Sequence, residues 1–167
     1  MEGGEGRDDG VADFDATFRE HYEPMVRGLG LACGDREVAA DAVQDAFLRA
    51  YARWGRISRY DDPAGWVRHV ALNRLRDHFR RATRGQRAVE RLVHRGDANP
   101  VLPPEPPADL SALLDTLPHQ QRIAVALFYV EQLSVREVAE SMGLSEGAVK
   151  YHLHAGRATL RARLEAT

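Results

Sequence analysis

The 167-residue sequence contains a single cysteine, Cys33, and a single lysine, Lys150. One cysteine excludes an internal disulfide and a zinc site built from cysteines. No apolar run approaches the roughly 20 residues that cross a bilayer. The N-terminus is acidic and rich in glycine, unlike a secretory signal. We therefore expect a cytoplasmic protein.

Net charge is also nearly absent, with a formal value of −2 at pH 7. The distribution along the chain is more informative than the sum. Acidic residues gather before position 16, whereas arginine gathers between Arg68 and Arg91. The chain has no glycine-rich phosphate loop and no nucleophile motif. We expect no enzyme activity, no cofactor and no metal site.

Apolar residues recur at helical spacing through most of the chain, and no strand pattern occurs. The sequence therefore predicts an all-α fold of two small helical domains joined by a linker rich in proline. We place a disordered acidic segment at residues 1–12 and the first domain at 13–84. The linker covers 85–108, and the second domain covers 109–167.

In the first domain, a helical stripe begins at Phe14 and is interrupted by Pro24, which predicts a kink or two short helices. Asp35 is positioned to cap a helix over 36–54 whose apolar face extends from Val38 to Trp54 and includes Tyr51. Residues 55–62 are predicted to form a loop. Asp62 followed by Pro63 predicts the start of a third helix, because proline suits the first helical position.

The second domain contains a helix-turn-helix pattern. Ser134 and Glu137 form a capping box, Gly143 stands where the first helix must turn, and Ser145 offers a second cap. On the second helix one stripe is expected to pack inward, and it consists of Val149, Leu153, Gly156, Leu160 and Leu164. The opposite face carries Gly147, Lys150, Tyr151, His154, Ala158 and Arg161. A short helix, a tight turn and a longer helix indicate DNA binding in the major groove.

Two stretches carry a specific resemblance. The strings Asp41-Ala-Val-Gln-Asp-Ala-Phe-Leu-Arg-Ala-Tyr51 and Trp66-Val-Arg-His-Val-Ala-Leu-Asn-Arg-Leu-Arg-Asp-His-Phe-Arg-Arg81 resemble region 2 of the extracytoplasmic-function (ECF) group of bacterial sigma factors. Residues 117–164 resemble sigma region 4. The resemblance covers about 14–83 and 109–164, in the order that the family has.

The resemblance implies a sigma factor that binds core RNA polymerase and directs transcription initiation at promoters. Its polymerase contacts would lie on the largest-subunit clamp helices and on the flap of the second-largest subunit. By match, the core-binding residues are Asp41, Gln44, Asp45, Phe47 and Arg49. The residues that recognise and open the −10 element are Arg56, Arg59, Tyr60, Asn73, Arg74, Arg76, Arg80 and Arg81, with Asn73 contacting an unstacked base.

Region 4 is expected to bind the −35 element through Gly147, Lys150, Tyr151, His154, Arg157 and Arg161. This sequence departs from the family here, because relatives carry arginine near the positions of His152 and Ala155. The loss of an arginine contact indicates a weaker hold on the −35 element. Isolated from polymerase, the second domain is expected to bind DNA poorly.

Two other interpretations remain open. One is a free-standing helix-turn-helix regulator that binds DNA as a dimer, which the lack of an evident dimerisation helix after Leu164 disfavours. The other is a sigma-like protein that acts only through protein contacts. Family members are commonly held inactive by an anti-sigma factor, so the resemblance also implies such a partner. No membrane insertion is expected.

Overall fold

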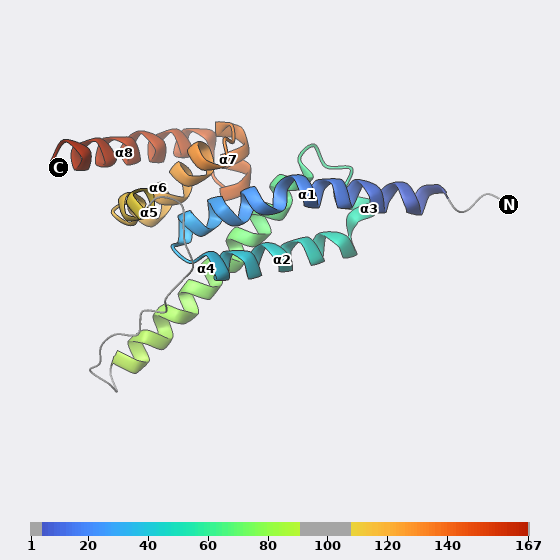
Figure 1. Cartoon of the computed structure of the whole chain (residues 1–167), viewed down its shortest axis with the longest axis horizontal. Coiled ribbons are helices and arrows are strands. Elements are labelled where there is room, and N and C mark those ends of the chain that lie inside the picture. Colours follow the sequence, from blue (N-terminus) through green and yellow to red (C-terminus); the bar gives the residue numbers. More distant parts are fainter. Residues whose placement is uncertain (1–4, 91–107, 167) are drawn as a thin grey trace.

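The computed structural model describes residues 5–90 and 108–166, and within these residues the secondary structure is entirely helical. Figure 1 shows the arrangement of the helices. We call α1 to α4 the N-terminal domain and α5 to α8 the C-terminal domain. The elements are α1 (Glu5–Cys33), α2 (Arg36–Ala52), α3 (Trp54–Ile57), α4 (Pro63–Glu90), α5 (Ala108–Asp115), α6 (His119–Val125), the π-helix η1 (Ala126–Val130), α7 (Val135–Met142) and α8 (Glu146–Glu165).

The first helix differs from the prediction in two ways. α1 begins at Glu5, within the segment for which composition predicted disorder, and it continues through Pro24 without a break. Of the two alternatives predicted at Pro24, two short helices was wrong, whereas a kink within one helix stays a prediction. A proline removes one helical hydrogen bond, while Met25 and Leu29, one and five residues after it, are fully buried. The burial of this apolar stripe outweighs the single lost bond.

The helices that follow begin at the predicted caps. The Asp35 carboxylate accepts from the Val38 amide over 3.1 Å, and the Asp62 carboxylate accepts from the Gly65 amide over 2.9 Å. The expected loop at 55–62 is partly helical, because α3 occupies Trp54–Ile57 and buries both of its end residues. The proline-rich stretch 91–107 lies outside the described residues.

The C-terminal domain contains the predicted helix-turn-helix, with both halves of the capping box formed. Ser134 Oγ accepts from the Glu137 amide at 3.1 Å, and the Glu137 carboxylate accepts from the Ser134 amide at 2.7 Å. Gly143 ends α7 in the left-handed conformation (φ 66°), where an L side chain would be strained. Ser145 then caps α8 through the Ala148 amide.

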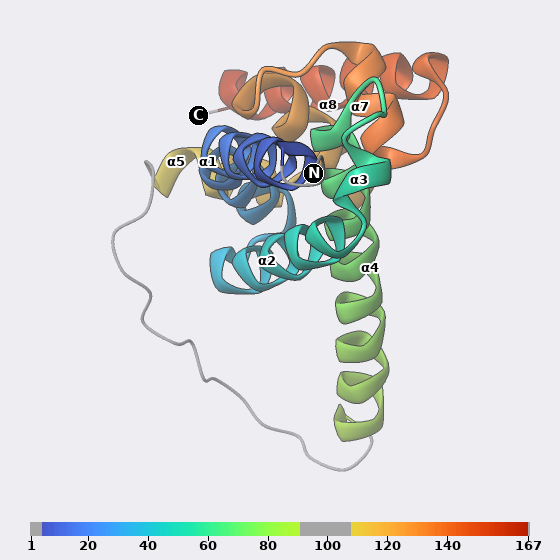
Figure 2. The ribbon, with the colours of Figure 1, turned by 90° about the vertical axis from the view of Figure 1, so that its right-hand side faces the viewer.

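The two domains pack against each other instead of standing apart. α7 lies against α4, while α6 and η1 lie against α1 (Figures 1 and 2). Buried side chains of both domains form one continuous hydrophobic core. The second half of α4 extends beyond the other helices in both views. In the described part of the chain, none of the helices combines the length and apolar character needed to cross a bilayer.

Candidate nucleic-acid interface and partner surfaces

The outer face of α2 combines acidic, amide and apolar side chains. Asp41 and Gln44 are exposed, as expected for residues that bind a partner. Two apolar side chains stand between them and the end of the helix, Leu48 at 63% exposure and Tyr51 at 56%. Tyr51 was predicted to be inward, which is wrong. Exposed large apolar groups beside polar ones are typical of protein interfaces.

Three of the predicted core-binding residues have structural partners within the domain. Asp45 forms ion pairs with Arg49 at 2.9 Å and with Arg74 of α4 at 3.0 Å. Phe47 is only 2% exposed, and its ring packs against Phe18 with 5.0 Å between the centroids. A partner therefore has no access to Phe47 in this conformation. Its burial follows from the same helical face that buries Val43 and Ala50.

A polar hollow of about 400 Å³ lies on the outer side of α4. Asn73, Arg74 and Arg81 line it, together with Arg49 from α2. The fold thus brings together four of the residues predicted to contact polymerase or the −10 element. Asp77 and His78 also line the hollow, so it offers hydrogen-bond donors and acceptors beside positive charge.

Other predicted −10 residues lie elsewhere. Arg56, Arg59 and Tyr60 are exposed on the segment before α4. Asn73 follows Pro63 by ten residues of helix, or about 15 Å at 1.5 Å per residue. Arg76 and Arg80 line a second hollow, which faces α6 of the C-terminal domain.

Asn73 is linked to the helix-turn-helix through His69. The Nδ1 atom of His69 lies 2.9 Å from the Ser141 carbonyl oxygen, and its Nε2 atom lies 3.1 Å from the Asn73 amide nitrogen. A carbonyl oxygen only accepts, so Nδ1 carries the proton, and in the neutral ring Nε2 accepts from Asn73. The predicted base-reading amide is therefore engaged beside the end of α7.

The outward face of α8 is as exposed as its angular pattern predicted. Lys150, Tyr151 and His154 are all exposed, and Tyr151 reaches 66%. A Cβ at Gly147 would meet only the Ser145 hydroxyl at 4.0 Å, so the start of the helix is open to close approach. His152 and Ala155 are half-buried, beside this face.

An apolar groove of about 430 Å³ separates α5 and η1 from the end of α8. Leu164 lines it and is 62% exposed, so its predicted inward position was wrong. α8 has 20 residues and extends about 30 Å, well beyond the seven or eight residues of α5, α6 and α7. Arg157 and Arg161 stand at the groove, and Arg157 donates to the Tyr129 hydroxyl at 3.1 Å.

The contact between the domains contains a buried ion pair. Arg68 Nε of α4 lies 2.8 Å from Glu131 Oε2, and the two side chains are 3% and 1% exposed. Burial, partly offset by the charge of Arg68, raises the pKa of Glu131. A Cβ on Gly28 of α1 would stand 2.5 Å from Glu131 Cγ, so only glycine leaves room there. Sequence inspection gave no sign of this pair.

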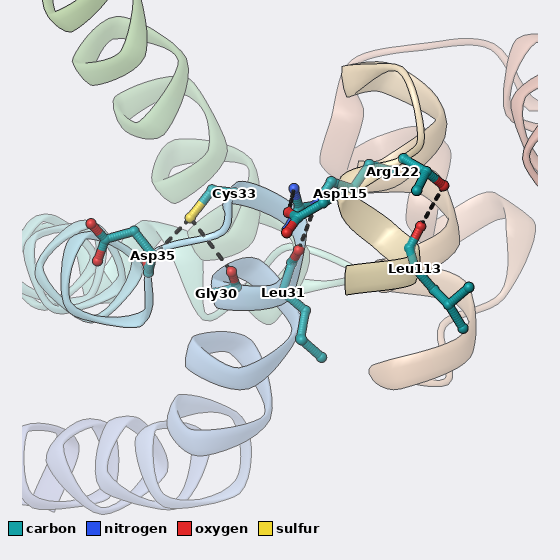
Figure 3. Close-up of polar contacts among 8 residues, drawn as sticks. Gly30, Leu31, Cys33, Asp35, Leu113, Asp115 and Arg122 are labelled. Carbon is teal, nitrogen blue, oxygen red and sulfur yellow. Dashed lines mark hydrogen bonds and ion pairs between the residues drawn. The ribbon is translucent and has the colours of Figure 1, made fainter. Parts of the chain in front are cut away.

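A second set of polar contacts joins α6 to the end of α1 (Figure 3). Arg122 Nε donates to the Leu31 carbonyl at 2.7 Å, while the same guanidinium pairs with Asp115. The Cys33 thiol contacts the Asp35 carbonyl at 3.3 Å, and burial raises the pKa of Cys33 to about 11. In the described part of the chain, no three His, Cys, Asp or Glu side chains gather as a metal site would require.

These features define a class of protein: an all-helical, two-domain DNA-binding protein with a helix-turn-helix and a second polar surface for nucleic acid or protein. Comparison with known proteins gives the family. Residues 18–85 match Sigma-70 region 2, and residues 108–160 match Sigma-70, region 4. The chain belongs to the ECF sigma factors of the sigma-70 family, the subunits that direct RNA polymerase to promoters.

Curated relatives support this assignment. The chain is 30% identical over 162 residues to the ECF RNA polymerase sigma factor SigE of Mycolicibacterium smegmatis, matching 90% of this chain and 61% of that protein. It is 31% identical over 158 residues to the RNA polymerase sigma-E factor of Streptomyces avermitilis, with 93% and 87% covered. The chain thus spans about three-fifths of the first relative and most of the second.

Two solved structures share the fold. The sigma factor RpoE from Bartonella quintana, in complex with the anti-sigma factor NepR, superposes with a TM-score of 0.75 at 19% identity. That comparison covers 92% of this chain and 97% of RpoE. CnrH, in complex with the cytosolic domain of CnrY, gives 0.61 at 26% identity, with 92% and 88% covered.

Proposed function

We propose that the exposed face of α2 binds the clamp helices of the largest polymerase subunit. Leu48 and Tyr51 supply apolar contact area, and Asp41 and Gln44 supply polar contacts at its border. Aromatic anchors surrounded by polar groups are the usual arrangement of strong interface contacts. Asp45 and Arg49 act by holding α2 against α4, through the pair that Asp45 makes with Arg74.

The hollow on α4 is the proposed −10 site. An amide such as that of Asn73 can both donate to and accept from a base edge, and arginines beside it hold the neighbouring phosphates. Arg74 and Arg81 stand beside Asn73 in the same hollow. This single arrangement carries the assignment, because a base taken out of the stack needs a recess as well as positive charge.

The outward face of α8 is the proposed −35 site. Lys150, Tyr151 and His154 would approach base edges and phosphates, and Gly147 would allow the DNA backbone close to the start of the helix. Arg157 and Arg161 lie further along, at the apolar groove. That groove fits an apolar helix, and we assign it to the flap of the second-largest subunit.

The packed arrangement is the proposed resting form. Asn73 contacts His69, which contacts Ser141, and Lys150 follows Ser141 by nine positions in the chain. At about 3.5 Å per residue this path limits the distance from Asn73 to Lys150 to roughly 45 Å, side chains included. Elements at −10 and −35 lie about 25 base pairs apart, or roughly 85 Å of B-DNA. The domains must therefore separate before both elements can be bound.

Residues 91–107 set how far the domains can separate. A chain of that length reaches up to roughly 60 Å at about 3.5 Å per residue. Together with the dimensions of the two domains, this length is enough for one domain to bind the −10 element while the other binds the −35 element. We propose that polymerase binding separates the domains and that an anti-sigma factor holds the closed form. The protein would act in the cytoplasm, where polymerase and promoters are found.

Transcription reconstituted from core polymerase tests the proposal. Core plus this chain should give promoter-specific transcripts from a genomic library, and core alone should give none. Asn73→Ala combined with Lys150→Ala should abolish those transcripts while leaving polymerase binding intact. Retained transcription by the double variant would favour a protein that acts only through protein contacts. Tight, specific DNA binding without polymerase would favour the free-standing regulator.

The proposed anti-sigma partner has its own test. Affinity purification of the tagged chain from its native host should recover, besides polymerase subunits, a protein whose binding excludes polymerase. We propose that this partner covers the face of α2 that binds polymerase, so the Leu48→Arg variant should lose both partners. Recovery of polymerase alone would contradict the anti-sigma proposal.

A further inference from the structure

A hollow of about 540 Å³ lies where the two domains meet. The end of α1 contributes Cys33, the second half of α4 contributes three arginines, and the start of α6 contributes His119. The arginines are Arg76, Arg80 and Arg84, which recur every fourth residue on one face of α4. No acidic residue is among those that line the hollow.

The positive charge in this hollow lacks a counterion. In the described part of the chain, neither Arg80 nor Arg84 takes part in an ion pair. Burial and then the charge of Arg80 lower the pKa of Arg76, while burial and then Arg76 and Arg122 lower that of His119. The positive charges of Arg76 and Arg80 therefore repel each other on the α4 side of the hollow.

The geometry also leaves a donor unused. The Nε atom of Arg76 is buried and has no hydrogen-bond partner, although its Nη2 atom donates to the Met142 carbonyl at 3.4 Å. A buried unpaired donor costs about 1–3 kcal/mol. An anion that enters the hollow would neutralise the surrounding charge, and a turn of the Arg76 side chain would bring its unpaired Nε to that anion.

We propose that this hollow binds a small diphosphate anion of the kind that nucleoside diphosphates carry. Guanidinium groups match phosphate oxygens in fork geometry, and two arginines one helical turn apart can bracket one diphosphate. The volume is within the range of small-ligand pockets and exceeds that of a diphosphate alone. Phe79, half-buried, lines the remaining space and offers an aromatic surface to an organic group.

A free small ligand fits this site better than a DNA backbone. The walls come from both domains, so the hollow exists only while the domains are packed together. That packed form cannot bind both promoter elements at once. A DNA strand would more readily follow the outer side of α4, where Arg74 and Arg81 stand.

Binding at this site has a consequence for the equilibrium between closed and open forms. A ligand that binds only the closed form raises the ratio of closed to open molecules by a factor of about one plus its concentration over its Kd. At 100 times the Kd the ratio rises about a hundredfold. The diphosphate ligand would thus act as an inhibitor of domain separation.

Titration calorimetry of the full chain with sodium pyrophosphate, at constant ionic strength, tests the site. We expect saturable one-to-one binding, and at least a tenfold loss of affinity in Arg80→Gln combined with His119→Gln. Arg81→Gln is the matched control, since it removes the adjacent charge from the other side of α4, and its affinity should stay within twofold. Pyrophosphate should also slow alkylation of Cys33 in the native chain but not in the double variant.

Three outcomes would overturn the proposal. The first is no saturable binding of pyrophosphate above that of sulfate at equal ionic strength. The second is an equal loss in Arg81→Gln, which would indicate general attraction to a basic helix. The third is that single-stranded DNA binds through Arg80 and His119 and that pyrophosphate does not displace it. The inference rests on the packed domains alone. If pyrophosphate does not bind, the proposed promoter recognition is unaffected. If reconstituted transcription fails, the proposed diphosphate site is unaffected.

Discussion

Arg68 and Glu131 form an ion pair over 2.8 Å across the contact between the two domains, and their side chains are 3% and 1% exposed. One charge comes from the helix that carries the proposed −10 site, and the other from the turn that leads into the helix-turn-helix. Removal of one partner would leave the other buried and unpaired while the domains stay together. The pair therefore links the charge state of the interface to whether the domains are closed or open.

Loss of the carboxylate should open the molecule. Glu131→Ala leaves Arg68 buried and unpaired, at a cost of about 3–5 kcal/mol to the closed form. Small-angle scattering should show a larger radius of gyration for the variant at unchanged helix content. The exposed pair Arg36–Glu23, at 3.3 Å, provides the control. Arg36→Ala should cost no more than about 1 kcal/mol and leave the radius unchanged. An unexpanded Glu131→Ala variant would contradict this role.

The stability contributed by Glu131 should depend on pH. Because burial raises its pKa in the folded chain, the folded form binds more protons than the unfolded form above the usual carboxyl range. The contribution is present at pH values below the unfolded pKa and is lost as pH rises through the folded pKa. Subtracting the free energy of unfolding of the Glu131→Gln variant from that of the native chain separates the contribution of Glu131 from that of the other carboxyl groups. Urea unfolding from pH 4 to 8 should show the difference (native minus variant) falling with pH. A difference that rises with pH would mean that the charge of Arg68 lowers the pKa of Glu131 by more than burial raises it.

A single methyl group on α1 should disturb the same contact. In Gly28→Ala the new Cβ would lie 2.5 Å from Glu131 Cγ, so the Glu131 side chain or α1 must move. We expect a loss of about 1–3 kcal/mol, in the range for overpacked cores. Gly55→Ala is the matched control, because a Cβ there meets nothing within 4 Å. Thermal unfolding of both variants checks this, and equal losses would refute the proposed close fit.

The face of α2 should control polymerase binding. Leu48 is 63% exposed, so Leu48→Arg should leave the fold intact while placing a charge in the proposed interface. We expect at least a tenfold loss of affinity for core polymerase, about 1.4 kcal/mol or more. Val11→Arg, at a 44% exposed apolar position on α1, is the control and should bind normally. Competition binding with core polymerase measures both, and unchanged affinity in Leu48→Arg would remove α2 from the interface.

The lone thiol should report on domain opening. Burial raises the pKa of Cys33 to about 11, so at pH 8 its thiolate fraction is on the order of a hundredfold below that of an ordinary cysteine. Alkylation by iodoacetamide should therefore be slow in the native chain. Cys33 lines the hollow between the domains, so opening in Glu131→Ala should accelerate the reaction. Equal rates in the native chain and the variant would show that the domain contact does not protect the thiol.

Several local features were predictable because their causes lie within a few residues. The caps at Asp35, Asp62, Ser134 and Ser145 formed as their spacing indicated. The errors came where a helix meets its surroundings. Tyr51 and Leu164 continue apolar stripes, yet both side chains are exposed. Tyr51 is covered only in part, by an edge contact with Phe14 of α1 at 5.1 Å between ring centroids, and Leu164 lies near the end of α8, where it lines the apolar groove. The periodicity of apolar residues predicts the direction in which a side chain points, but not whether another helix covers that side chain.

By itself, the sequence determined the helical class, the helix-turn-helix with its caps, and the ECF sigma family. Hydrogen bonds between neighbouring residues, apolar periodicity and motif order carry that information. Only the tertiary structure decided that the domains pack together, that Arg68 meets Glu131 beside Gly28, and that α4 divides its arginines between two hollows. These features join residues that are distant in the chain: Arg68 and Glu131, for example, are 63 positions apart. No local pattern specifies such contacts, because they arise where separate helices approach one another.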